Sequence, residues 1–187
     1  TFTAVNGTTY FVYVSHYDDS GSSTGDFTIS RSCSGGTAAP VNDLCANATA
    51  LPCATTDLAG TTVGATNSSV ATCSETTDYG VWYTFVGDGN TNTITVQNVS
   101  LDTEMALFTG SCSSLTNVTC LDASGAMTPE VYNFVATLGT TYYLYIGYFG
   151  TGSTTGDFTV SRACYPPPSN DLCGNATPLP CGTNALA

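Results

Sequence analysis

The sequence predicts an all-β fold: an antiparallel β-sandwich that is held by disulfides and repeated in tandem about every 130 residues. Short apolar runs are separated by Gly, Ser, Asn and Thr at the close spacing typical of sandwich strands. Nine cysteines against a single histidine indicate disulfides formed in an oxidising compartment. Strings of sequence also recur at a nearly constant spacing, which indicates a repeat.

Runs rich in β-branched and aromatic residues mark the expected strands, and no stretch has the period of an amphipathic helix. The turn GDGN at 87–90 follows the first run and predicts a hairpin between the first two strands. The predicted strands are Val81–Val86, Thr93–Gln97, Met105–Phe108, Asn117–Leu121, Val131–Ala136, Tyr142–Ile146 and Asp157–Ser161.

Two strings define the length of the repeat. TGDF occurs at 24–27 and at 155–158, an offset of 155 − 24 = 131 residues. NDLC occurs at 42–45 and at 170–173, an offset of 170 − 42 = 128 residues. A unit of this length is a domain and not a turn of a solenoid.

The repeat divides the chain into five predicted segments. Residues 1–33 are the C-terminal strands of a preceding repeat, 34–41 a linker, 42–164 one complete β-sandwich repeat, 165–170 a Pro-rich linker, and 171–187 the N-terminal segment of a following repeat. Neither partial repeat has enough strands to bury its own apolar face. We therefore expect adjacent repeats of the same polypeptide, or neighbouring copies of the chain, to complete them.

The charge and the apolar runs of the chain each exclude one class of partner. Fourteen acidic and two basic residues give a formal net charge of −12. A nucleic-acid site needs a stripe of basic residues that displaces counterions from phosphates, and this chain cannot build one. No apolar run approaches the roughly 20 residues that cross a bilayer, so no membrane insertion is expected.

The repeat also predicts how the cysteines pair. Cys45 and Cys53 recur together as Cys173 and Cys181, which favours a local bridge in each copy. Cys33 is the counterpart of Cys164 and is expected to pair upstream. The predicted bridges are Cys45–Cys53, Cys173–Cys181, Cys112–Cys120 and Cys73–Cys164.

Aromatic residues outside the expected core form a candidate contact surface. Tyr142, Leu144 and Ile146 share the face expected to be core, whereas the face with Tyr143 and Tyr145 is either covered by a loop or offered to a partner. Packing between domains is favoured over stacking on glycans, because tyrosine is enriched at protein interfaces. The candidate interface or ligand surface comprises Phe11, Tyr13, Tyr17, Tyr143, Tyr145 and Tyr148.

Calcium is the one cofactor that the sequence suggests. Asp102 and Glu104 precede one predicted strand and Asp122 follows the next, so their carboxylates converge if these strands pair. Carboxylate oxygens are the ligands that calcium prefers. The favoured interpretation is nevertheless that these side chains are solvated strand ends and that no cofactor is bound. The aspartates of the repeated NDLC and TGDF strings are instead expected to cap turns through Asx hydrogen bonds: Asp43, Asp171, Asp26 and Asp157.

No catalytic residue is predicted, and the chain is not expected to be an enzyme. His16 is the single histidine, and its counterpart in the complete repeat is Tyr148, so the complete domain contains no imidazole. No nucleophile-elbow, P-loop or dinucleotide-binding pattern is present.

Several strings resemble a known family. DYGVWYTFVGDGNTNTITV, DTEMALFTGSC and GTTYYLYIGYFGTGSTTGDFTVSRAC resemble the bacterial pre-peptidase C-terminal (PPC)-like β-sandwich. The PxNDLCxNATxLPC header resembles the join between copies in large secreted and surface adhesin-type proteins of Bacteroidetes-like bacteria. The resemblance implies a jelly-roll-like sandwich, secretion, and an accessory or adhesive role. In some relatives the domain trails a secreted hydrolase, and nothing in this chain resembles that part.

Together these features predict a structural or adhesive segment of an extracellular filament or giant repetitive surface protein. Tandem or strand-complemented sandwiches would assemble it, with copies of itself or adjacent repeats as partners. The alternative is a carbohydrate- or substrate-binding accessory module of a secreted enzyme. Both hypotheses place the chain outside the cell or at the cell surface.

Overall fold

The computed structural model describes the chain except residues 1–3, 5–7, 16–24, 32–36, 67–78, 99–100, 124, 126, 151–153, 179–180 and 182–187. The chain divides into two compact units, Thr1–Ser34 and Gly35–Ala187, and each is described by itself. Among the described residues, no helix is long and apolar enough to cross a membrane.

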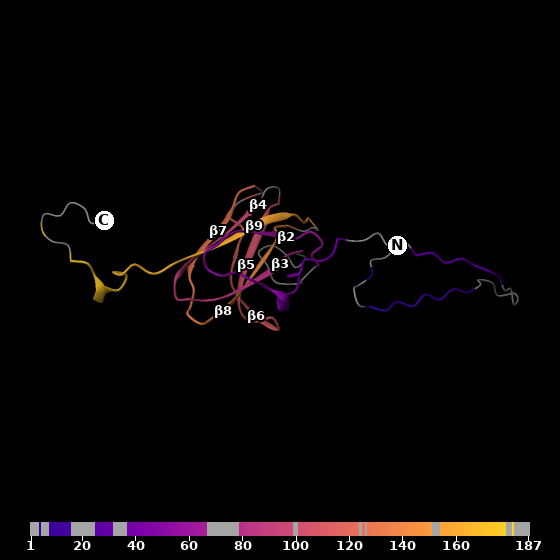
Figure 1. The fold of residues 1–187 in the computed structure, drawn as a ribbon, viewed down its shortest axis with the longest axis horizontal. Helices are drawn as coiled ribbons and strands as arrows, with labels where there is room; N and C mark the ends of the chain where they lie inside the picture. The colour runs from indigo at the N-terminus through magenta and orange to yellow at the C-terminus, as the bar shows by residue number, and fades with distance from the viewer. Residues whose placement is uncertain are drawn as a thin grey trace. The chain divides into compact units, whose positions relative to one another are not determined.

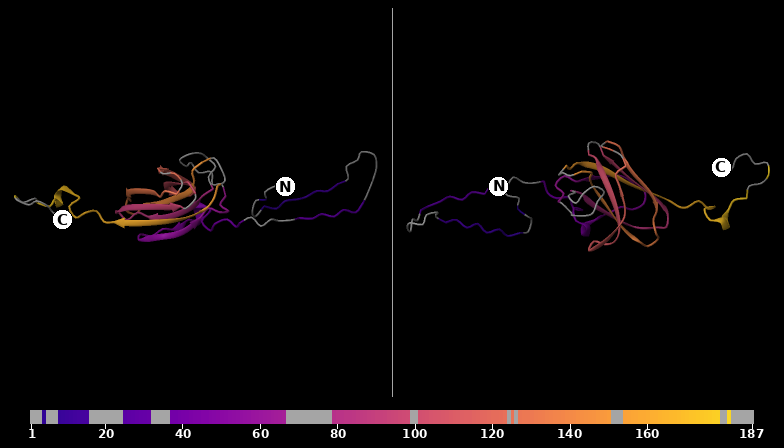
Figure 2. Two further views of the ribbon diagram at one scale, coloured as in Figure 1. Left: turned by 90° about the horizontal axis from the view of Figure 1, so that it is seen from above. Right: turned by 180° about the vertical axis from the view of Figure 1, so that it is seen from behind.

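Two β-sheets stack face to face in the second unit, which confirms the sandwich (Figures 1 and 2). The five-stranded sheet has the order β1-β3-β8-β5-β6 and the four-stranded sheet the order β2-β9-β4-β7. All pairings are antiparallel except that of β1 with β3. The strands are β1 Thr49–Ala50, β2 Thr55–Thr61, β3 Val81–Val86, β4 Thr91–Asn98, β5 Thr103–Ser111, β6 Ser114–Leu121, β7 Glu130–Val135, β8 Thr141–Tyr148 and β9 Asp157–Tyr165, with short 3₁₀ turns η1 Cys45–Asn47 and η2 Cys173–Asn175.

The main core lies between the two sheets, because alternate residues of each strand point inward. In β8 these are Tyr142, Leu144 and Ile146, as predicted, and in β9 they are Phe158 and Val160. All are at most 5% exposed.

The outer face of the five-stranded sheet carries a second apolar cluster. It contains Trp82, Ala106, Phe108 and Tyr145, and the Trp82 and Tyr145 rings lie 5.0 Å apart between centroids. Cys45, Ala48 and Tyr143 are among the partly buried side chains that pack against it. Both faces of this sheet are therefore buried at its centre, which explains why β8 is apolar on both sides.

The predicted hairpin between β3 and β4 is wrong. These strands belong to different sheets: β3 pairs with β8, and β4 pairs with β7 and β9. The bend between them does not pair β3 with β4: the N–H groups of Gly87 and Gly89 donate to the carbonyls of Thr140 and Ala136, in the segment between β7 and β8. The tight hairpin is β5–β6, where Ser111 faces Ser114.

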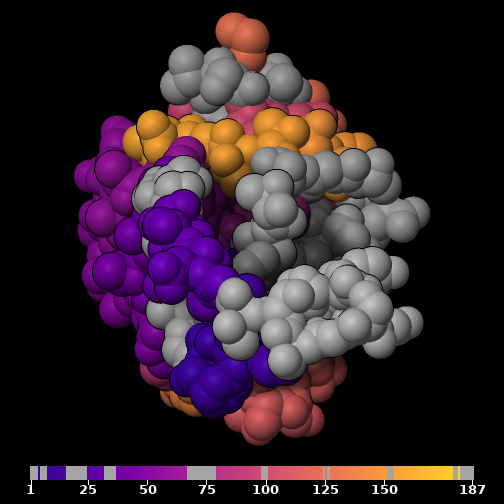
Figure 3. All heavy atoms as spheres, turned by 90° about the vertical axis from the view of Figure 1, so that its right-hand side faces the viewer, coloured from indigo at the N-terminus to yellow at the C-terminus, as the bar shows by residue number. Residues whose placement is uncertain are grey.

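In the first unit, residues 8–15 and 25–31 are two extended segments that run beside each other (Figures 1 and 2). Their side chains are exposed at the surface, indigo to violet in Figure 3. These residues correspond in the repeat to β8 and β9, where the equivalent apolar side chains are buried except the half-buried Tyr143. The exposed large apolar residues are Tyr10, Phe11, Val12, Tyr13, Val14, Phe27 and Ile29.

Candidate functional site

The segment Asn42–Cys53, here called the strap, crosses the sandwich before β2 begins. Its first residues are anchored by side chains. Asn42 Nδ2 donates to the Trp82 carbonyl at 2.9 Å, and the Trp82 N–H donates to the Asn42 carbonyl at 2.8 Å. Both Asn42 and Asp43 are only 7% exposed, although they precede the first strand.

Asp43 joins two distant loops. Its Oδ1 accepts the backbone N–H of Thr66 at 2.6 Å, and its Oδ2 accepts the Thr66 hydroxyl at 2.7 Å. The predicted local Asx cap is therefore wrong for Asp43, because both acceptors are used by a residue 23 positions away. The same prediction stays untested for Asp26, Asp157 and Asp171.

The middle of the strap covers the outer cluster. The 3₁₀ turn η1 places Cys45 and Ala48 against the cluster that contains Trp82. Cys45 is disulfide-bonded to Cys112, at the tip of the β5–β6 hairpin. The strap is thus fixed to the sheet by a covalent bond as well as by apolar contact.

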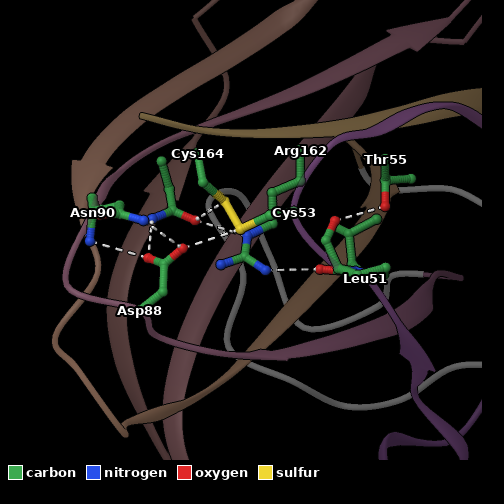
Figure 4. Close-up of a disulfide and its surroundings, with 9 residues drawn as sticks. Leu51, Cys53, Thr55, Asp88, Asn90, Arg162 and Cys164 are labelled. Atoms are coloured by element: carbon green, nitrogen blue, oxygen red, sulfur yellow. Dashed lines mark hydrogen bonds between the residues drawn. A yellow bond between two sulfur atoms is a disulfide. The ribbon is translucent and has the colours of Figure 1, made fainter. Parts of the chain in front are cut away.

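The end of the strap enters the main core. The Leu51 side chain is fully buried between the sheets, and its N–H donates to the Thr84 carbonyl at 2.8 Å. Cys53 is disulfide-bonded to Cys164 in β9 (Figure 4). The first and last segments of the sandwich are therefore linked directly.

Arg162 supports this end of the strap and is only 2% exposed. Its Nη1 donates to the Leu51 carbonyl at 2.9 Å (Figure 4). Its Nε donates to Asn92 Oδ1 at 2.7 Å. Burial lowers the pKa of Arg162 while the charge of Asp88 opposes this shift, and an arginine stays protonated in either case.

Asp88 supplies the negative charge near this arginine. Burial tends to raise the pKa of Asp88, but hydrogen bonds from Asn90 and Asn92 outweigh it and lower the pKa overall. Asp88 Oδ2 also lies 3.0 Å from the Cys53 sulfur, a close contact without a proton because that sulfur is in a disulfide. For the same reason the grouping of Cys53, Asp88 and Cys164 offers no thiolate to a metal.

The predicted cysteine pairing is wrong for the complete repeat. Cys45 and Cys53 keep a constant spacing because both belong to the strap, and each binds a different part of the sandwich. Cys120 is disulfide-bonded too, but not to Cys112, and Cys73 lies outside the described residues. Cys33 also lies outside the described residues. The predicted bridge in the second copy is not formed either, since Cys173 and Cys181 are free and exposed.

The predicted calcium residues lie near the open ends of β5 and β6, which do pair. Glu104 is fully buried, and Asp102 Oδ1 is buried with no hydrogen-bond partner among the described residues. Burial raises the pKa of Asp122, and the charges of Asp102 and Glu130 raise it further. No three of these four carboxylates place oxygens within 4.8 Å of one another.

Glu130, at the start of β7, was not predicted from the sequence. It is 1% exposed, and its Oε2 accepts the Ala123 N–H at 2.9 Å. The available signal for this residue was its position: in the string TPEV, Glu130 directly precedes the predicted strand Val131–Ala136. The like charges of these acidic residues repel one another. Binding of a cation or a proton would reduce this repulsion.

The predicted aromatic surface is only partly exposed. Tyr145 is fully buried, so its inclusion was wrong, and Tyr143 and Tyr148 are half-buried. Phe11 and Tyr13 are 93% and 89% exposed. Tyr17 and His16 lie outside the described residues.

A hollow of about 620 Å³ opens between the β1 and β2 edges of the two sheets. Its aromatic lining comes from Tyr83 and Phe158, which are 2% and 3% exposed. Neither ring offers an open face on which a sugar could stack.

Comparisons with known proteins follow the geometry. Residues 41–160 match the family model described as "Galactose binding domain-like", which carries a T9SS-associated label. A pre-peptidase C-terminal domain of collagenase from Bacillus anthracis is 21% identical with a TM-score of 0.42, covering 62% of this chain and 93% of its own. PliG of Aeromonas hydrophila, a periplasmic inhibitor of g-type lysozyme, is 12% identical with a TM-score of 0.40, covering 63% of this chain and 96% of its own. No curated protein matches the sequence.

Proposed function

Because this chain belongs to the galactose binding domain-like family, we propose that it is a non-catalytic structural segment of an extracellular repetitive assembly. The exposed apolar residues of the first unit carry this proposal. Val12 and Phe27 are 69% and 66% exposed, whereas their counterparts Leu144 and Phe158 are 1% and 3% exposed. Exposed apolar side chains that lie together in this way mark a surface that another protein segment covers.

The covering surface is expected to be the remainder of a sandwich. Residues 8–15 and 25–31 correspond to β8 and β9, which lie in different sheets of the complete domain. Strands equivalent to β3 and β4 would pair with them and bury their inward side chains, a form of β-strand addition. These strands would come from an adjacent repeat of the polypeptide or from a neighbouring copy.

The proposed place of action is outside the cell or on its surface. Disulfides persist in oxidising compartments and are rare in the cytosol. The T9SS label of the family, which refers to a bacterial secretion system, points the same way.

Electron microscopy of the native material tests the structural role. We expect filaments or beaded chains of sandwiches, and isolated monomers would contradict the proposal. Val12→Asp should abolish association through the first unit. Val86→Asp is the matched control, since Val86 is similarly exposed, at 58%, on the complete sandwich and should leave association unchanged.

Carbohydrate binding is the second candidate, favoured by the galactose binding description of the family. A glycan array probed with and without calcium separates it from the structural role. Saturable binding of one glycan class by the full chain would support an accessory binding module, and assembly without glycan binding would support the structural one.

A further inference from the structure

Around its 3₁₀ turn η2, the second copy of the strap sequence already has the backbone conformation of the docked strap. Residues 170–181 differ from 42–53 only at two positions, Gly174 for Ala46 and Pro178 for Ala50. The residue before the 3₁₀ turn has φ −105°, ψ 141° at Leu44 and φ −93°, ψ 141° at Leu172.

The hydrogen bonds of the two copies also agree. The N–H of Asp43 donates to Pro40 at 3.1 Å, and that of Asp171 to Pro168 at 3.0 Å. The 3₁₀ turn closes with the Asn47 N–H on Leu44 at 2.8 Å, and the Asn175 N–H closes its turn on Leu172 at 2.8 Å. The turn therefore forms from local sequence alone, before any sandwich covers it.

The surroundings of the two copies differ completely. In the strap, Asn42 and Asp43 are nearly buried and both cysteines are bonded. In the second copy, every described residue is exposed, and Cys173 and Cys181 are free thiols. The second copy thus holds the shape and the reactive groups of a docked strap without its receptor.

We propose that residues 168–181 form a docking segment, pre-formed around the 3₁₀ turn η2, whose partner is a second β-sandwich of the same kind as 55–164. Cys173 would bond to the cysteine equivalent to Cys112, and Cys181 to the one equivalent to Cys164. This inference rests on the proposed function, and it names the partner of the C-terminal part of the chain. A segment fixed in its bound conformation loses less entropy when it docks.

The substitution at Pro178 is compatible with docking. Pro178 replaces Ala50 of β1, an edge strand that pairs only with β3. The N–H of Leu51 donates to β3, so by the alternation of a strand the N–H of Ala50 faces the open edge. Proline, which lacks an N–H, is tolerated at such a position.

Covalent locking needs an oxidant, which would be a small-molecule disulfide such as oxidised glutathione. For each bridge, two thiols lose two protons and two electrons and form one S–S bond. The small-molecule disulfide gains these two protons and two electrons and is released as two thiols. The polar anchors Asn170 and Asp171 would hold the segment in place, as Asn42 and Asp43 do in the strap.

The test uses the full chain extended by a second copy of residues 60–164, because Ala187 is the counterpart of Ala59 (187 − 128 = 59). After refolding in a glutathione buffer, non-reducing peptide mapping should link Cys173 to the appended Cys112, and Cys181 to the appended Cys164. Monomers on a non-reducing gel mean docking within one polypeptide, and cross-linked dimers mean docking between copies. Either product supports the proposal.

Three results would overturn it: a Cys173–Cys181 bridge beside a folded appended sandwich, two free thiols beside a folded appended sandwich, or an appended copy that does not fold. The original 42–164 sandwich in the same molecule is the folding control. Asp171→Ala should reduce the bridged fraction of the appended copy about tenfold at limiting oxidant, since it removes charged hydrogen bonds. Asp43→Ala should instead affect only the original sandwich. Failure here with filaments still present would refute the docking segment and leave the structural role intact.

Discussion

The guanidinium carbon of Arg162 lies 4.0 Å from the centre of the Phe85 ring, between the two sheets of the sandwich. A cation over an aromatic face is attracted by the negative potential of the ring. The same guanidinium satisfies the Leu51 carbonyl and the Asn92 amide oxygen. One buried charge therefore ties the strap, β3, β4 and β9 together.

Arg162→Ala should lower the free energy of unfolding by about 3 kcal/mol, because it leaves two buried acceptors without a donor and opens a cavity. Guanidinium chloride unfolding measures this. Arg31→Ala is the matched control: Arg31 is the repeat counterpart but is exposed, so its loss should cost less than about 0.5 kcal/mol. Equal effects of the two variants would contradict the role of Arg162.

Replacing both Cys53 and Cys164 by serine should destabilise the sandwich by about 4 kcal/mol, because their bond closes a loop with a sequence separation of 111. The measurement is the denaturant midpoint under non-reducing conditions. Replacing the free Cys173 and Cys181 by serine is the control and should leave the midpoint unchanged. A destabilised control would mean that these thiols contribute to the sandwich.

Asp122→Asn should stabilise the chain at pH 7. The pKa of Asp122 is raised by burial and by the charges of Asp102 and Glu130, so the folded state binds a proton more tightly than the unfolded state. The penalty from this carboxylate is therefore present above its folded pKa, and it disappears below its unfolded pKa of about 3.9. Unfolding temperatures from pH 3 to 7 should show the gain of the variant shrinking as the pH falls. Asp157→Asn, at an exposed position, is the matched control for the removal of one negative charge.

Millimolar calcium tests the cation site predicted at Asp102, Glu104 and Asp122. A bound cation would neutralise the same repulsion and raise the unfolding temperature of the unmodified chain above its value in EDTA. The increase should be smaller in Asp122→Asn, which lacks one carboxylate. Identical unfolding temperatures with and without calcium would show that no cation binds.

The sequence predicted seven strands close to their observed bounds, because their residues are β-branched or aromatic and turn residues separate them. It missed β1 and β2, which are short or polar and lie at sheet edges, where little apolar surface is buried. Strand pairing was harder to predict. Gly87–Asn90 has the composition of a hairpin turn, but its hydrogen bonds to the β7–β8 segment direct the chain into the other sheet.

The candidate sites were predicted less well, because they depend on contacts between residues far apart in the sequence. The constant spacing of Cys45 and Cys53 identified a unit but not its bonding partners. Tyr145 alternates like a surface residue, yet the strap covers it. The approach of Glu130 to Asp122 follows from the arrangement of β6 and β7, which no local pattern reveals.

The bond between Cys53 and Cys164 has a mechanical consequence for a fibre made of such units. Tension that enters at the strap and leaves after β9 passes through two sulfur atoms and bypasses the residues between them. The 111-residue separation hides roughly 370–400 Å of extended chain from the applied force. A stretched repeat should therefore barely lengthen until a reductant cuts this bond. The Cys45–Cys112 bond, with a sequence separation of 67, must be cut as well before the chain that it spans can extend.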